Sequence, residues 1–200
     1  MTLPLAGLAA GLALIVAIGS QNAFVLRSGL TRRHVGPVVA VCTLSDVVLI
    51  AAGVAGIGTI VTRAPVVLDV VRWGGVAFLA AYAVLSFRRA WRGGEGLDAQ
   101  GAGTAGLAAA VTTALALTWL NPHVYLDTVL LLGSLANQHG DDGRWLFAAG
   151  AATGSLLWFT ALGYGARLAS PLFRRPAAWR VLDALIGVTM LLIAAGLASG

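Results

Sequence analysis

Long apolar runs are the feature that most limits what this chain can fold into. Six of them reach or exceed the roughly 20 residues that a helix needs to cross a bilayer. They cover residues 3–26, 36–61, 65–87, 105–136, 145–168 and 180–199. Only 10% of the 200 residues are charged, whereas soluble domains carry about 25%. We therefore expect an all-α membrane protein with six transmembrane helices, or with five if one run lies along the membrane interface.

The fourth run is too long to be one straight helix across a membrane. Its 32 residues would extend for about 48 Å at 1.5 Å per residue, against a hydrocarbon core of about 30 Å. Asn121-Pro122 lies near its centre, and a proline removes a backbone donor and clashes with the preceding turn. A break at Pro122 is predicted, either as a bend in one helix or as a gap between two half-helices.

The basic residues are all arginines, and they form short clusters between the apolar runs. With six spans, ten arginines fall on one side of the membrane and three on the other. The three are Arg63, Arg72 and Arg144. The positive-inside rule then places the ten in the cytoplasm and both chain termini outside. The net charge of +5 is thereby explained by membrane topology, and we expect no nucleic-acid partner.

A glycine-rich segment at 93–103 divides the chain near its middle. It predicts a flexible cytoplasmic linker between a first three-helix repeat, 1–92, and a second, 104–200. The two halves are weakly similar, because "NAFV" from Asn22 matches "NPHV" from Asn121. An odd number of spans per repeat inverts the second copy in the membrane. Inverted repeats with broken helices are a recurring plan of transporters, with the binding site near the bilayer midplane.

Asp46 and Asp127 are the only carboxylates that we place deep in the predicted spans. A charge there is costly, and such residues usually face the bundle interior or a wet cavity. The alternative is a packing role in which each Asp bonds to a neighbouring helix. His123 is four residues from Asp127 and shares its helical face. Asn121 and Tyr125 fall nearly opposite at about 100° per residue, so a regular helix cannot direct all four into one cavity.

The first half has a polar insert of its own, "GSQNAF" at 19–24. Gly19 is the expected helix break there, and the amides of Gln21 and Asn22 can donate and accept hydrogen bonds to a zwitterion. The alternative is that the insert is a helix end at the membrane interface. No nucleophile elbow or phosphate loop appears, and one Cys with three His makes no metal cluster. We therefore expect no enzyme activity, no cofactor and no ATP-driven pump.

Several stretches resemble one family of membrane proteins. They are "GSQNAFVLRSGL" at 19–30, "CTLSDVVLIAAGVAG" at 42–56, "RWGGVAFL" at 72–79 and "TWLNPHVYLDTVLLLGSLA" at 118–136. The chain is similar in these stretches to the LysE/ArgO family of lysine and arginine exporters. The resemblance implies a multi-pass exporter in the bacterial inner membrane, with Asp46 and Asp127 important and Asn121 and Pro122 at the central break. The family usually has proline where this chain has Ser20, which leaves open how sharply the first span bends.

The residues and the resemblance together give a hypothesis of function. Asp46 and Asp127 bind the cationic side chain of lysine or arginine, while Gln21, Asn22 and Asn121 hold its α-groups. Supporting positions beside the site are expected for Ser45, His123 and Tyr125. Exchange for a proton would cancel the cost of moving a positive charge outward, roughly 2.3 kcal/mol per 100 mV. Expected partners are thus the substrate, protons and the bilayer, with a homodimer left open.

Two other classes of function stay open at this point. The cargo could instead be a neutral amino acid or a divalent metal cation. The chain could also be a scaffold subunit of a membrane assembly that transports nothing, with both Asp residues acting between helices.

Overall fold

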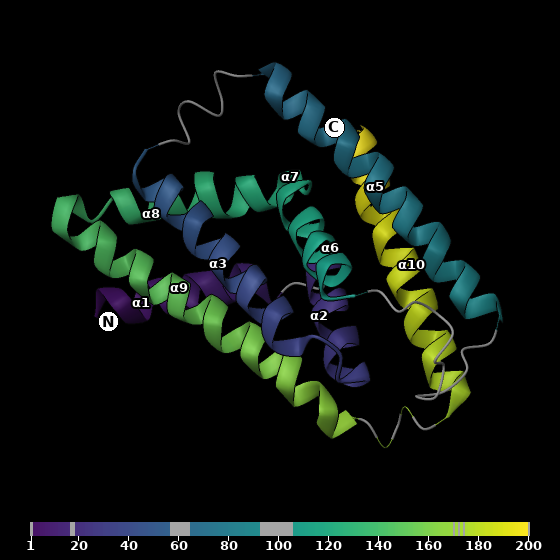
Figure 1. The fold of residues 1–200 in the computed structure, drawn as a ribbon. Helices are drawn as coiled ribbons and strands as arrows, with labels where there is room; N and C mark the ends of the chain where they lie inside the picture. Colours follow the sequence, from purple (N-terminus) through teal and green to yellow (C-terminus); the bar gives the residue numbers. More distant parts are fainter. Residues whose placement is uncertain are drawn as a thin grey trace.

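Helices make up most of the part of the chain that the structure describes. The computed structural model describes residues 2–16, 19–56, 65–92, 106–169, 171, 173 and 175–199, with no strand among them. In chain order the helices are α1 (Leu3–Ile15), α2 (Ser20–Thr31), α3 (Val35–Val54), α5 (Pro65–Arg92), α6 (Leu107–Trp119), α7 (Pro122–Val124), η1 (Tyr125–Leu132), α8 (Gly133–Asn137), α9 (Gly140–Gly165), η2 (Ala166–Ala169) and α10 (Pro176–Ser199) (Figure 1). The all-α prediction is confirmed here, and the predicted linker at 93–103 lies outside the described residues.

Several of these helices can cross a bilayer. By length and composition, Val35–Val54, Gly140–Ala169 and Ala177–Ser199 each suffice alone. The pair formed by α1 and α2 counts as a fourth span if it is taken together, although its two helices meet at 86°. This result among the described residues supports a membrane protein, and the six spans of the sequence analysis stay a prediction.

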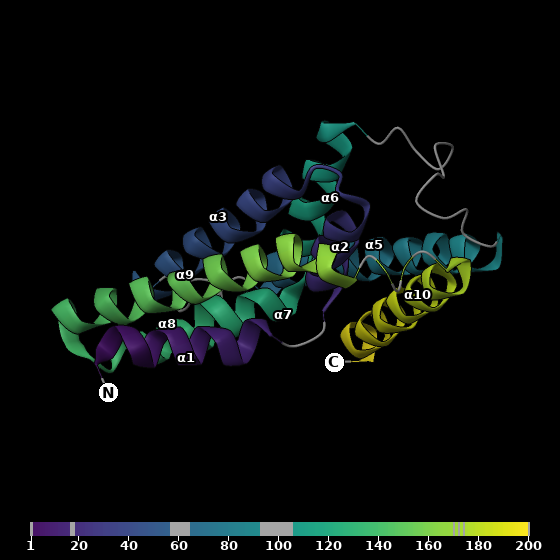
Figure 2. The same ribbon diagram turned by 90° about the horizontal axis from the view of Figure 1, so that it is seen from below.

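Small residues bring α1 and α9 into close contact, and Figure 2 shows the two helices running side by side. A Cβ atom on Gly7 would collide with the Phe147 carbonyl of α9, and one on Gly150 would collide with the Pro4 carbonyl of α1. Between apolar helices in lipid, such close backbone approach supplies the van der Waals contact that holds them together. The α1–α9 pair therefore depends on glycine at these positions.

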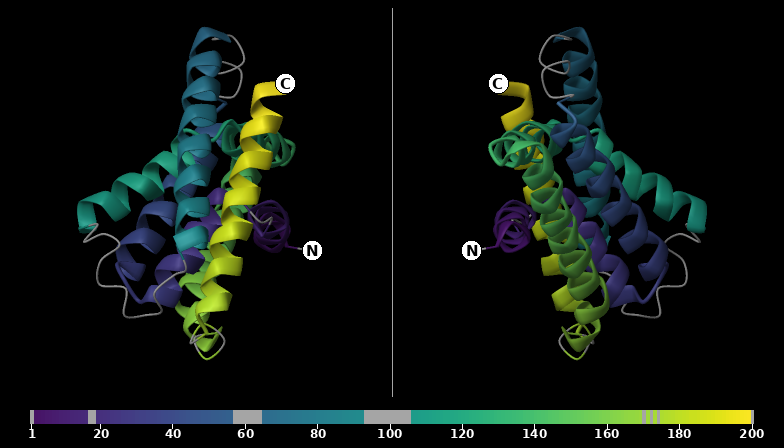
Figure 3. Two further views of the ribbon diagram at one scale, coloured as in Figure 1. Left: turned by 90° about the vertical axis from the view of Figure 1, so that its right-hand side faces the viewer. Right: turned by 90° about the vertical axis from the view of Figure 1, so that its left-hand side faces the viewer.

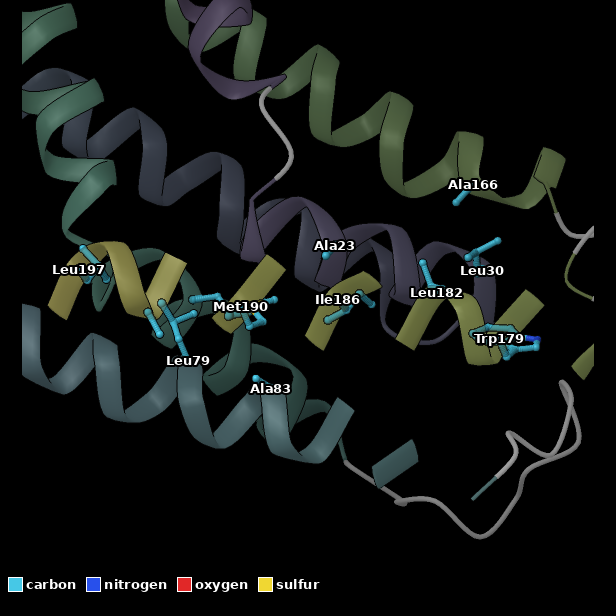
Figure 4. Close-up of a cluster of buried hydrophobic side chains, with 12 residues drawn as sticks. Ala23, Leu30, Leu79, Ala83, Ala166, Trp179, Leu182, Ile186, Met190 and Leu197 are labelled. Atoms are coloured by element: carbon cyan, nitrogen blue, oxygen red, sulfur yellow. The ribbon is translucent and has the colours of Figure 1, made fainter. Parts of the chain in front are cut away.

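The helices α5 and α10 form a second pair and run side by side (Figure 3). Leu79 and Ala83 of α5 pack with Ile186 and Met190 of α10 in one buried cluster, and Ala23 of α2 joins it (Figure 4). Arg72, which lies in α5, donates hydrogen bonds to the carbonyls of Leu197 and Ala198. Those carbonyls belong to the last turn of α10, where no intrahelical donor remains.

An ionic cluster ties this pair to α2. Asp183 of α10 is only 2% exposed and forms an ion pair with Arg27 of α2 and a second with Arg89 of α5, whose Nε lies 3.2 Å from the carboxylate. Arg89 also donates to Ser86 Oγ at 2.7 Å. One carboxylate thus joins three helices, at the end of the α5–α10 pair opposite to Arg72.

Candidate functional site

The first helix break lies between α1, which ends at Ile15, and α2, which begins at Ser20. A helix end leaves its last carbonyls without intrahelical donors. Asn22 meets this need, because its Nδ2 donates to the Ile15 carbonyl at 2.7 Å. Its Oδ1 in turn accepts from Trp158 Nε1 of α9 at 3.2 Å. The Asn22 amide therefore bridges the break and anchors it to α9.

The second break lies between α6, which ends at Trp119, and α7, which begins at Pro122. Asn121 Oδ1 accepts from the backbone N–H of His123 at 3.2 Å. The Tyr125 hydroxyl donates to the Trp119 carbonyl at 2.8 Å, which satisfies a backbone group that the break leaves open. Trp119 Nε1 also donates to Ser45 Oγ of α3 at 3.1 Å. This break is therefore anchored to α3, as the first is to α9.

The helix resumes after the second break in a wider form. Residues Tyr125–Leu132 are a π-helix, a rare conformation that is frequent at functional sites. On a regular helix Asn121 would point away from His123 and Asp127. The break and the wider turn bring Asn121, His123 and Asp127 to one cavity, while Tyr125 turns back to α6. The expectation that these side chains could share a cavity only if the helix is irregular agrees with this placement.

A cavity of about 270 Å³ lies where the two breaks meet. Its volume is close to the lower end of small-molecule sites, roughly 300–1,000 Å³. The lining comes from both broken helices and from α3, α9 and α10. The lining residues are Leu14, Ile15, Gly19, Ser20, Gln21, Asn22, Asp46, Asn121, His123, Val124, Asp127, Thr128, Phe159 and Ile193. The space suits one small polar molecule with an apolar portion.

Asp46 is the most buried acid of this cavity. It is 3% exposed, and Ser155 Oγ of α9 donates to its Oδ2 at 2.7 Å. Among the described residues, no arginine forms an ion pair with Asp46 or with Asp127. A buried carboxylate that has only a hydroxyl partner keeps most of its desolvation cost. The site is thus suited to a cation or a proton that comes from outside the protein.

Comparisons with known proteins identify the family of this chain. A family model described as LysE type translocator matches residues 12–200. The chain belongs to this family.

Relatives cover nearly the whole of this LysE type translocator. The lysine exporter LysE of Corynebacterium diphtheriae is 40% identical over 98% of this chain and 99% of its own length. The arginine exporter protein ArgO of Yersinia enterocolitica is 45% identical over 97% of this chain and 95% of its own. A provisionally named amino-acid transporter of Mycobacterium tuberculosis is 51% identical over 90% of this chain and 88% of its own length. No solved structure matches.

Membership of the family settles the broad class of this translocator. It is a multi-pass membrane transport protein and not an enzyme. The resemblance to the LysE/ArgO family found in the sequence is thereby confirmed.

The structure brings most of the residues singled out in the sequence to the cavity. Those that line it are Gly19, Gln21, Asn22, Asp46, Asn121, His123 and Asp127. Ser45 and Tyr125 lie outside the lining and hold the second break through their contacts with Trp119. Pro122 begins α7 at that break.

Sequence reasoning missed three polar residues of the translocator. Ser155 donates a hydrogen bond to Asp46. The signal that could have found it is that Ser155 precedes Gly163 in the second half at the spacing by which Ser45 precedes Gly53 in the first. Ser20 lines the cavity from the start of α2. Asp183, near the start of the last predicted span, is buried as well, and it has no role in the sequence analysis. Its arginine partners lie 94 and 156 residues away in the sequence, so no local pattern could indicate them.

Proposed function

We propose that this translocator exports basic amino acids, L-lysine and/or L-arginine, across the inner membrane in exchange for protons. The observation that carries the proposal is Asp46, a buried carboxylate without an arginine partner among the described residues, beside Asp127 in a cavity between two broken helices. Relatives that match nearly the full chain are named as exporters of lysine and of arginine.

The cationic end of the substrate binds to the two carboxylates. A guanidinium or ammonium group would supply Asp46 with the counter-charge that a buried anion needs. Ser155 fixes the orientation of the Asp46 carboxylate through its hydrogen bond. Asp127 is partly exposed, so it offers the first contact to a cation that enters the cavity, with His123 beside it on the same wall.

The amide groups of the cavity hold the α-carboxylate and the α-amine. Gln21 and Asn121 line the cavity from the first and the second break respectively. Asn22 contributes differently, because both polar ends of its side chain already have partners in the protein. Its role in the proposal is to keep the first break in shape.

Proton exchange follows from the electrical cost of export. Moving one positive charge out of a negative interior costs roughly 2.3 kcal/mol per 100 mV, and inward movement of one proton cancels this term. Asp46 serves as the switch, since it is neutral when it carries a proton and anionic when it binds the substrate cation. Proton and substrate therefore compete for one carboxylate. The Asp46 charge is balanced in both directions, by the substrate cation during export and by the proton during its return.

The proposal includes two inverted three-helix repeats, 1–92 and 104–200, with both termini outside. The contacts between helices support it. The first broken helix packs on α9 through α1 and α2, and the second packs on α3 through α6, η1 and α8. Two further long-range pairs, α3 with α9 and α5 with α10, join equivalent members of the two halves.

Efflux from preloaded cells tests the proposal. Cells that lack their own exporters are loaded with radiolabelled arginine or lysine, and efflux is followed with and without a pH gradient. The variant Asp46→Asn with Asp127→Asn should lose at least 100-fold in rate at unchanged protein level in the membrane. The control is Asp69→Asn, an acid that is exposed on α5 and outside the cavity, and it should export normally.

Each other result has a defined meaning. Normal efflux from the double variant would remove the carboxylates from the mechanism and favour a packing role for them. Efflux of a neutral amino acid or of a divalent metal, with none of arginine or lysine, would change the cargo. A wild-type protein that moves none of these would favour a scaffold.

A further inference from the structure

Ser20 has an unusual environment for a hydroxyl in a helix. It is fully buried, it lines the cavity, and its Oγ has no hydrogen-bond partner among the described residues. Thr113, Thr118 and Thr153 each donate instead to the carbonyl four residues earlier in their own helix. Ser20 is the first residue of α2, so no earlier turn of that helix offers such a carbonyl.

The backbone around Ser20 also presents donors. The bond from Ala23 N to the Gly19 carbonyl lies at the start of α2, and the backbone N–H groups of Ser20 and Gln21 have no acceptor within that helix. The first turn contains no acidic side chain, and Gly19 provides no side-chain cap. The aligned peptide dipoles give this end of the helix a partial positive charge. Together these features form a ready site for an anion.

The two walls of the cavity therefore differ in charge. Asp46 and Asp127 contribute negative charge from α3 and η1, whereas the start of α2 contributes donors and a partial positive charge. Gln21 adds to the second wall, where its buried Nε2 has, among the described residues, only the thiol of Cys42, a weak acceptor, beside it. Burying a hydroxyl without a partner is unfavourable, and a ligand acceptor at this wall would remove that cost.

We infer that Ser20 and the first turn of α2 bind the α-carboxylate of the substrate, so that the translocator selects amino acids over amines that carry the same cationic group. This inference rests on the proposed function and adds an orientation to it. The carboxylate lies at α2, and the cationic side chain lies at the two aspartates. Ser20 thus determines specificity through a contact that a decarboxylated or amidated analogue cannot make as a charged group.

Binding to the purified protein tests this assignment. Affinities of L-arginine and of L-argininamide, which lacks the negative charge, are measured for wild type, for Ser20→Ala and for Ser28→Ala. Ser28 is a buried serine of the same helix that does not line the cavity. A hydrogen bond to a charged group contributes more than a neutral one, so Ser20→Ala should weaken arginine binding by about tenfold or more. Its affinity for argininamide should change by less than about threefold.

The outcomes separate this inference from the function on which it rests. Wild type that binds arginine, with Ser20→Ala binding it equally well, overturns the carboxylate site and leaves the proposed function standing. An equal loss for arginine and argininamide overturns it too, because the hydroxyl would then act elsewhere. Wild type that binds neither lysine nor arginine overturns the proposed function and this inference together. Retained argininamide binding by Ser20→Ala shows that the variant is folded.

Discussion

Two buried aspartates of this protein, Asp46 and Asp183, differ in how their charge is met. Both lie in apolar helices, and they are 3% and 2% exposed. Asp183 has two arginines, Arg27 and Arg89, from two other helices. Asp46 has one serine hydroxyl, from Ser155. Equal burial therefore accompanies very different electrostatic environments.

The difference separates a carboxylate that holds the fold together from one that faces a cavity. The Asp183 cluster contains its own cations and lies outside the cavity lining, so its charge is used within the protein. Asp46 lines the cavity, and the cation that would balance it must be exchangeable. Matched substitutions at the two sites can test this reading, because replacing Asp by Asn changes the charge and almost nothing of the shape.

The largest effect on stability is expected for Asp183→Asn. Removing one partner of a buried ion pair costs about 3–5 kcal/mol. The side chains of Arg27 and Arg89 are 23% and 28% exposed, and solvent screening reduces the loss. We expect the free energy of unfolding to fall by about 2–3 kcal/mol, seen as a lower melting temperature of the purified protein.

A second substitution sharpens this result. In the Asp183→Asn background the two arginines repel each other, so adding Arg89→Gln should recover part of the lost stability. A melting temperature of Asp183→Asn equal to that of wild type would show that the ionic cluster does not hold α10 to α2 and α5.

A smaller effect is expected for Ser155→Ala. This change removes the hydroxyl that donates to Asp46 and leaves the carboxylate buried. Hydrogen bonds to charged groups contribute about 1.5–3 kcal/mol, so we expect a loss of about 1–2 kcal/mol. The control is Thr153→Ala on the same helix, an exposed residue that bonds only to its own helix, with a change within about 0.5 kcal/mol. Equal melting of both variants would mean that Ser155 does not support Asp46.

The contrast between the two aspartates also marks what the sequence could predict. Asp46 is recognisable because charged residues are rare in its apolar run, and Asn121-Pro122 is recognisable because proline interrupts a helix. The cluster around Asp183 depends on side chains that only the folded chain brings together. In the sequence, the positive-inside rule already explains Arg27 and Arg89, so nothing there indicates that they also form ion pairs with Asp183.

Helical periodicity was a limited guide to the site for a related reason. It assigns faces correctly only while the helix is regular. Between Trp119 and Leu132 the chain breaks and then continues as a π-helix, so Asn121 reaches the same cavity as Asp127. The sequence indicates the break, but only the structure shows which side chains on either side of it face the cavity.

The smallest effect on stability is expected for Asp46→Asn, although it should be the most damaging of these changes for export. The amide can still accept the hydrogen bond from Ser155 through its remaining oxygen, and no arginine loses a partner. Because the substitution also removes the cost of burying a charge, we expect the free energy of unfolding to change by less than about 1 kcal/mol. Melting of the purified variant beside Asp183→Asn, together with arginine efflux, checks this directly. A fall in stability as large as that of Asp183→Asn would make Asp46 a structural residue. The contrast between Asp183, whose charge is balanced by arginines of the protein, and Asp46, whose charge is balanced by an exchangeable cation, would then no longer hold.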